Sequence, residues 1–229
     1  MNKEVITPAI VLKRVNYGEY DRILTVITPD NGKLSLIAKG SRKIKSKLSG
    51  SIELFSVFEA KILNSNYNLA ILVSARSVSY YQNIVKDIAR VQLGYLALKT
   101  IDLITQDNSD HDFYKLLEEF LILLNNDQNS ITVLQNWLKA QLLVINGHTP
   151  NLITDIENKK LIKNQTYSID IENMVLSSKG KITDQDIKIL RILFNPNGSK
   201  MIFRIEEAEK IIKKLDSTIE AMFMRHLSV

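Results

Sequence analysis

The sequence predicts an α+β protein in which a small closed β barrel is followed by a helical region. Residues 5–80 contain five short apolar segments separated by turn signals, as in a compact β domain. From about residue 83 the apolar spacing changes from a period of two to a helical period. With 229 residues, 45% of them hydrophobic, the chain is long enough to bury one large core or two small ones.

The first 80 residues are assigned to an oligonucleotide-binding (OB) fold domain, residues 1–80. Asn31-Gly32, after a predicted strand, is a strong short-range hairpin signal. Five antiparallel strands in so short a segment are typical of the five-stranded OB barrel. The strands are expected at Val5–Val15, Arg22–Thr28, Lys33–Lys39, Leu54–Leu63 and Leu69–Tyr80.

Residues 81–229 are predicted to form an all-helical domain with a small irregular insertion. A largely buried helix should begin near Asn83, with Ile88 and Tyr95 on its buried face. The insertion, residues 151–181, is polar and has a hairpin pattern around Tyr167–Ile171 and Met174–Ser177. The other helices are expected at Phe113–Leu124, Ser130–Ile145, Thr183–Phe194 and Arg204–Leu227, with Ser130 and Thr183 as N-caps and Gly147 as a terminator.

Positive charge is concentrated in the N-terminal third. Residues 1–80 hold 12 Lys or Arg and 6 Asp or Glu, whereas residues 81–150 hold 5 and 8. Between Asn31 and Glu53 there are six basic residues and no acidic one. Such a localised excess is the electrostatic footprint expected of a polyanion-binding surface. The basic residues of this stretch are Lys33, Lys39, Arg42, Lys43, Lys45 and Lys47.

The alternation within this stretch predicts how the cations are presented. Leu34, Leu36 and Ala38 should point into the barrel, and the alternate residues, from Lys33 to Lys39, should point outward. From Gly40 onward the chain is punctuated by Gly and Ser and is expected to be a loop. Together with Arg22, the six cations are our predicted DNA-binding residues. A short charge run is, however, usually a solvated loop, so this pattern alone does not establish binding.

The sequence contains no residue pattern typical of a catalytic centre. The chain has no cysteine, and His111, His148 and His226 lie far apart in polar loops or at helix ends, where solvent exposure is expected. No Ser/His/Asp pattern, phosphate-binding Gly loop or metal-ligand spacing is present. Glu19 and Asp21 lie beside turn residues, which favours a structural role. We therefore expect no enzyme activity, no cofactor and no metal.

Two blocks of the sequence resemble the RecO family of bacterial DNA repair proteins. The first runs from Tyr17-Gly18-Glu19-Tyr20-Asp21-Arg22 through Asn31-Gly32-Lys33 to Ala38-Lys39-Gly40-Ser41-Arg42, and it resembles that family's hairpin and basic loop. The second is the helix end at Leu138–Pro150. The resemblance covers residues 1–150 well and residues 151–229 loosely.

The resemblance implies a non-enzymatic mediator of DNA repair and homologous recombination. Such proteins bind single- and double-stranded DNA, anneal complementary strands and help load recombinase together with RecR. They also bind the acidic C-terminal tail of the single-strand-binding protein. Many carry a four-cysteine zinc site in the region matching the insertion, and this chain lacks the cysteines for it. We expect a cytoplasmic protein, associated with the nucleoid when on DNA.

The acidic tail implied by the resemblance ends in an aromatic residue and a free carboxylate. Its receptor needs an apolar slot and a cation at the rim. The predicted helix Ser130–Ile145 offers Leu138 and Leu142 for the slot and Lys139 for the rim, although such leucines are more often core residues. The alternative to DNA repair is an RNA-binding or ribosome-associated OB-fold factor, because phosphate contacts do not distinguish RNA from DNA.

Overall fold

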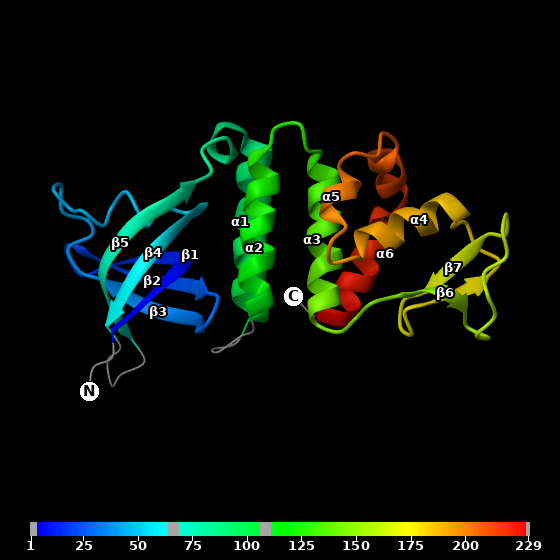
Figure 1. The fold of residues 1–229 in the computed structure, drawn as a ribbon, viewed down its shortest axis with the longest axis horizontal. Coiled ribbons are helices and arrows are strands. Elements are labelled where there is room, and N and C mark those ends of the chain that lie inside the picture. The colour runs from blue at the N-terminus through cyan, green and yellow to red at the C-terminus, as the bar shows by residue number, and fades with distance from the viewer. Residues whose placement is uncertain (1–3, 64–68, 106–110, 228–229) are drawn as a thin grey trace. The chain divides into compact units, whose positions relative to one another are not determined.

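The structure is a computed structural model that describes residues 4–63, 69–105 and 111–227. The fold is α+β, with an N-terminal five-stranded barrel followed by helices and a small second sheet (Figure 1). The chain divides into two compact units, Met1–Asn126 and Asp127–Val229, which are described separately below. In the described ranges, none of the helices has the length and apolar character needed to cross a membrane.

The first unit is built on a closed barrel with the strand order β1-β2-β3-β5-β4, which confirms the predicted OB barrel. One pairing differs from the expectation of five antiparallel strands, because β3 and β5 run parallel at Leu36–Ala70 and Ile37–Ile71. Chain direction alternates from strand to strand, so two odd-numbered neighbours must run the same way. The strands are β1 (Glu4–Tyr17), β2 (Asp21–Thr28), β3 (Gly32–Ala38), β4 (Ser56–Leu63) and β5 (Ala70–Tyr80).

The barrel interior follows the predicted alternation. Leu36 and Ala38 are fully buried, and Leu34 packs against the same core. The segment between β3 and β4 also contributes, because Ile52 is fully buried in this core. The basic loop is therefore fastened to the barrel at its far end by apolar packing as well as by its connection to β3.

Two helices complete the first unit, α1 (Ile88–Ile104) and α2 (His111–Asn125), after a 3₁₀ turn at Ile84–Lys86. The helix predicted from residue 83 begins later because the Asp87 side chain accepts hydrogen bonds from the amides of Ala89 and Arg90 and so forms the N-cap. The predicted buried face of this helix is wrong in part, because Ile88 and Tyr95 are 77% and 51% exposed.

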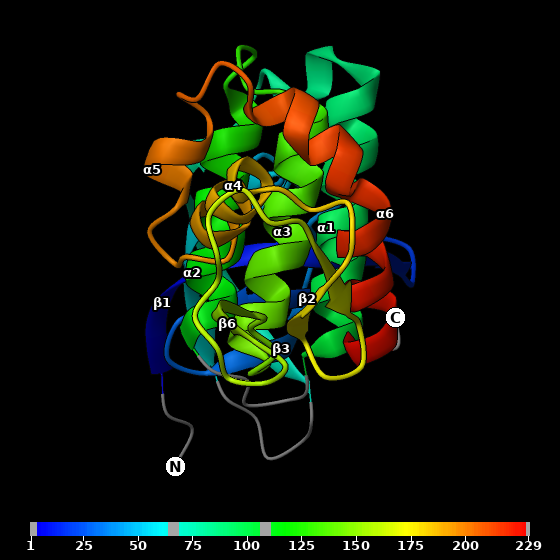
Figure 2. The same cartoon turned by 90° about the vertical axis from the view of Figure 1, so that its right-hand side faces the viewer.

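The second unit is held together by α3 (Ile131–Ile145) and α6 (Ala208–Leu227), which lie side by side in Figures 1 and 2. Trp137 on α3 is 1% exposed and belongs to its core. Gly147, with φ of +82°, follows the end of α3 as predicted. The last helix begins at Ala208 rather than Arg204, and Ser130 precedes α3 without a capping hydrogen bond from its side chain.

The segment predicted to be irregular forms a small sheet with the order β6-β8-β7. The hairpin of β7 (Tyr167–Asp170) and β8 (Val175–Ser178) confirms the predicted one, whereas β6 (Asn151–Asp155) was not expected. The helix α4 (Asp184–Leu193) has the predicted Thr183 cap, completed by Asp186 in a capping box. A short helix, α5 (Ser199–Ile202), precedes α6.

Candidate nucleic-acid interface

The outward face of β1, β2 and β3 provides a surface of cations and half-exposed apolar side chains. Strand register places its residues in transverse rows, each row contributed by three strands. Val15 in one of these rows is 49% exposed, and Ser35 in another is exposed. The two rows are Lys13, Thr25 and Ser35, and Val15, Ile23 and Ile37.

The basic loop after β3 is attached to the β1–β2 turn. The Gly40 amide donates to Asp21 Oδ1 at 2.7 Å, and the Arg42 amide donates to the Tyr20 carbonyl at 2.9 Å. Gly18 and Gly40 have φ of +56° and +65°, a backbone region that favours glycine. These contacts give a physical reason for the Gly-Glu-x-Asp-Arg and Ala-Lys-Gly segments, and they give Asp21 the structural role expected from its position.

Five of the seven predicted DNA-binding residues have exposed side chains, and all five belong to this loop. Lys43 lies with its ammonium 5.4 Å from the centre of the Tyr20 ring, a cation–π contact. Arg42 Nη1 donates to the Gly18 carbonyl at 3.3 Å. Over the described ranges none of the five forms an ion pair with a carboxylate. They are Lys39, Arg42, Lys43, Lys45 and Lys47.

The other two predicted residues have different surroundings. Lys33 Nζ donates to the carbonyls of Asp102 and Thr105 at 2.8 and 2.6 Å, which satisfies the C-terminal end of α1, and its side chain is 17% exposed. Arg22 Nη1 lies 4.0 Å from Glu53, whose carboxylate also accepts from Arg14 at 2.7 Å. Both residues therefore have partners within the first unit that stabilise the fold.

The predicted partner-binding residues lie in the core of the second unit. Leu138 and Leu142 are 4% and 0% exposed. Lys139 forms an ion pair with Glu220 of α6, and its side chain is 9% exposed. The leucines therefore have the core role that was the alternative to an exposed slot.

Aromatic side chains suited to base stacking are few. Tyr17 and Tyr20 are 53% and 44% exposed, and a hydrogen bond with Glu19 raises the pKa of the Tyr20 hydroxyl. Phe55 and Phe58 are buried. Tyr67 lies outside the residues that the structure describes.

The histidines do not assemble a metal centre. The rings of His148 and His226 are stacked with centroids 4.7 Å apart, and both residues are half-buried, so the exposure predicted for them is wrong. Their proximity could not be predicted from the sequence because they are 78 positions apart. Among the residues that can be described, no three metal-binding side chains of His, Asp or Glu come together.

Comparison with known proteins shows which family and which relatives the chain resembles. The family described as "Recombination protein O N terminal" matches residues 1–81, the barrel. "DNA repair protein RecO" of Dehalococcoides mccartyi strain 195 is 26% identical over 227 residues, which cover 94% of this chain and 87% of the relative. The protein of that name from Thermoanaerobacter sp. strain X514 is 25% identical over 97% of this chain and 92% of its own length.

Identity is higher over shorter segments. "DNA repair protein RecO" of Trichodesmium erythraeum is 33% identical over 113 residues, which cover 49% of this chain and 39% of the relative. The matched N-terminal domain, the barrel with its OB strand order and the near full-length alignments agree with one another. The chain is therefore similar to the RecO family of DNA repair proteins, in its barrel and along most of its length.

Proposed function

We propose that the chain binds single- and double-stranded DNA by its phosphate backbone through the basic loop and the outward face of the barrel. The observation that carries this proposal is the group of five exposed, carboxylate-free cations on a loop that is fastened to the barrel. Lys and Arg that are not paired with a carboxylate can neutralise phosphates without first breaking an ion pair. A surface of this kind binds the backbone and reads no particular sequence.

The cellular role that we propose is mediation of recombination. The protein would anneal complementary strands and, together with RecR, help load recombinase on DNA coated by single-strand-binding protein. The names of the relatives support the repair context, and the cation surface supports the DNA contact. We propose that no step of this role involves catalysis, and that the acidic tail of the single-strand-binding protein is a further ligand.

The proposal can be tested with a loop variant in which Lys39, Arg42, Lys43, Lys45 and Lys47 are replaced by alanine. A control variant removes the same number of charges from exposed lysines of the second unit. Both retain the contacts that fasten the loop to the β1–β2 turn through backbone atoms. The control replaces Lys160, Lys163, Lys181, Lys188 and Lys200 by alanine.

Binding and strand annealing should be measured with matched DNA and RNA oligonucleotides in competition. We expect wild type and control to bind and anneal DNA and the loop variant to lose both activities. Preference for RNA over DNA of the same sequence would favour an RNA-binding OB-fold factor instead. Equal DNA binding by the loop variant, with native circular dichroism, would contradict the proposed surface.

A further inference from the structure

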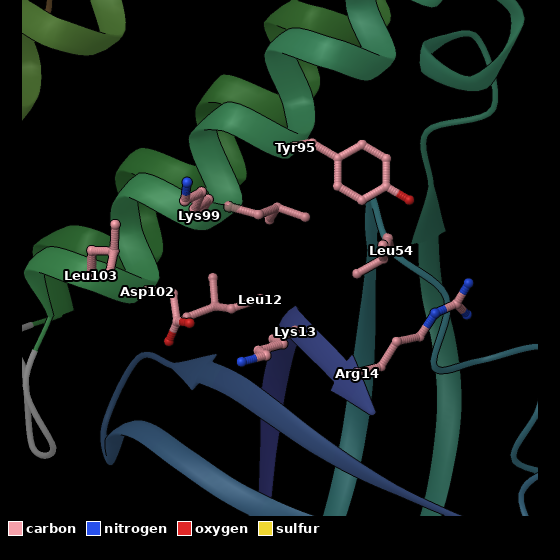
Figure 3. A pocket seen from close by; sticks show the side chains of 9 residues that line it. Leu12, Lys13, Arg14, Leu54, Tyr95, Lys99, Asp102 and Leu103 are labelled. Carbon is pink, nitrogen blue, oxygen red and sulfur yellow. The ribbon is translucent and has the colours of Figure 1, made fainter. Parts of the chain in front are cut away.

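A pocket of about 520 Å³ lies between the barrel and α1, within the first unit (Figure 3). Its size falls in the range of roughly 300–1,000 Å³ that is usual for ligand sites. One wall is residues 12–14 of β1, another is Leu54 before β4, and the third is the side of α1 that faces the barrel. The apolar lining includes Leu12, Leu54 and Leu98, and the cations around it are Lys13, Arg14 and Lys99.

The charge of the pocket favours an anionic ligand. Asp102 is its acidic residue, and the Lys33 ammonium already lies 3.5 Å from that carboxylate. Arg14 is bound to Glu53. Lys13 and Lys99 are exposed and have no carboxylate partner in the part of the chain that the structure describes. Two cations are therefore available to a phosphate group.

Tyr95 gives the pocket a surface on which a base can stack. Tyr95 is 51% exposed, and its ring packs with the Phe55 ring in a T-shaped arrangement, with centroids 5.4 Å apart and an interplanar angle of 79°. Phe55 is itself 3% exposed, so the tyrosine is supported by a buried side chain. An aromatic ring held in this way is the element that single-strand-binding surfaces combine with cations.

The pocket is continuous with the outward face of the barrel. Lys13 lines the pocket and also belongs to the transverse row with Thr25 and Ser35. A strand that crosses the outward face of β1 to β3 can therefore reach the pocket at Lys13. This continuity favours DNA over an unrelated small anion as the occupant.

We propose that this pocket binds a nucleotide of single-stranded DNA, with the base on Tyr95 and the adjacent phosphate between Lys13 and Lys99. The inference rests on the proposed function, because it extends the same DNA path. A single strand is required, since a base stacked inside a duplex has no free face for the tyrosine. The pocket would then make the protein favour single strands, while the basic loop contacts either form.

The test uses the full chain with Tyr95→Leu, which keeps an apolar side chain, and Tyr95→Phe, which keeps the ring. Fluorescence anisotropy with an oligothymidine and with a matched duplex gives affinities for both forms. We expect Tyr95→Leu to weaken single-strand binding on the order of 5- to 100-fold, with little change for the duplex. Tyr95→Phe should bind like wild type.

Lysine variants test the phosphate contact. Lys99→Gln should reduce the salt slope of single-strand binding by about 0.7, the value for one lost phosphate contact. Lys115→Gln is the matched control, since this exposed lysine lies on α2 outside the pocket. Photocrosslinking of wild type with an oligonucleotide that contains 4-thiothymidine should label Tyr95 or Lys99, which avoids any dependence on variant folding.

The outcomes separate this inference from the proposed function. Unchanged single-strand affinity of Tyr95→Leu, while the loop variant has lost binding, would overturn the pocket and leave the proposed function intact. Failure of wild type to bind any DNA would contradict both the pocket inference and the proposed function. Tyr95-dependent binding of an acidic peptide with an aromatic end, without any effect on DNA, would also overturn the inference and assign the pocket to a protein ligand.

Discussion

Asp186 shows at the scale of one residue how a buried charge stabilises the second unit. Its carboxylate accepts from the Thr183 amide and hydroxyl at 2.7 and 2.9 Å and is paired with Lys214. Burial alone would raise the pKa of Asp186, but the hydrogen bonds from Lys214 and Thr183 outweigh it and lower the pKa below its ordinary value. The charged form is therefore the one that the fold stabilises.

The lowered pKa predicts how stability depends on pH. The contribution of Asp186 is fully present above the unfolded pKa of about 3.9 and is lost as pH falls toward the folded value. Asp186→Asn should lower the free energy of unfolding near pH 7 by about 1.5–3 kcal/mol, the usual value for hydrogen bonds to a charged group. It should also flatten the fall in stability below about pH 4.

Trp137, the single tryptophan, is buried in the second unit and reports its unfolding by fluorescence. Lys188→Gln, an exposed site on α4, serves as a control for Asp186→Asn. An acid transition of Asp186→Asn identical to that of wild type would show that this carboxylate does not carry the pH dependence.

Lys139 gives the second prediction at this scale. Lys139→Glu would place a second carboxylate beside Glu220. A buried pair that loses one partner costs about 3–5 kcal/mol, and because the Glu220 side chain is 45% exposed we expect a smaller loss of about 1–3 kcal/mol. Lys139→Met, which keeps the apolar stem, should lose less stability than Lys139→Glu.

The same two variants test the predicted partner site. Tryptophan fluorescence in denaturant measures stability, and titration with a labelled acidic tail peptide measures binding. Normal stability of Lys139→Glu together with lost peptide binding would contradict a structural role and would return Lys139 to the rim of a peptide site.

At the scale of elements, the contact between α1 and the barrel depends on a glycine. A Cβ added at Gly94 would lie 2.7 Å from Cε1 of Phe55, closer than carbon atoms pack. Phe55 is held at φ of +60° and is buried, so its ring has little freedom to move. The helix therefore needs glycine at a position where helix propensity alone would favour alanine.

Gly94→Ala should destabilise the first unit by about 1–3 kcal/mol through overpacking, although the same change in an open helix stabilises by about 1 kcal/mol. The free energy of unfolding can be followed by circular dichroism. In the background of Phe55→Leu, which replaces the ring by a shorter side chain, Gly94→Ala should lower the free energy of unfolding much less. Equal costs in both backgrounds would show that the ring contact is not the cause.

Elements also show which predictions a local pattern supports. All five barrel strands were predictable because alternation and turn residues are encoded within each segment. The strand β6 was missed because its parallel partner β8 begins 24 residues later, and a short strand without a neighbouring turn signal has no local signature. The Thr183 cap was predictable since its partner Asp186 lies three residues away.

At the scale of the whole molecule, the sequence predicted which cations are present but not which of them are available. Lys33 lies on the predicted outward side of its strand, yet α1 ends against it and its ammonium binds the helix carbonyls. Leu138 and Leu142 have the spacing of both a core helix and an exposed apolar slot, and only the packed structure distinguishes the two. Tyr95 was likewise assigned to a buried face, because helical spacing alone does not show which side of a helix is covered.

The pocket between the barrel and α1 could not be predicted from the sequence either. Lys13 and Lys99 are 86 positions apart, and no pattern relates them until the helix packs on the barrel. The excess of positive charge in residues 1–80 was the available signal, and it includes Lys13 but not Lys99.

The central claim is that the loop cations hold DNA by its phosphates, and the salt dependence of affinity tests it most directly. If about four phosphates are neutralised, log K for single strands should fall with log salt at a slope of about −3, roughly 50-fold between about 50 and 200 mM. The loop variant should bind more weakly with a flatter slope, while the control variant keeps the wild-type slope. A folded loop variant with an unchanged slope would contradict the claim.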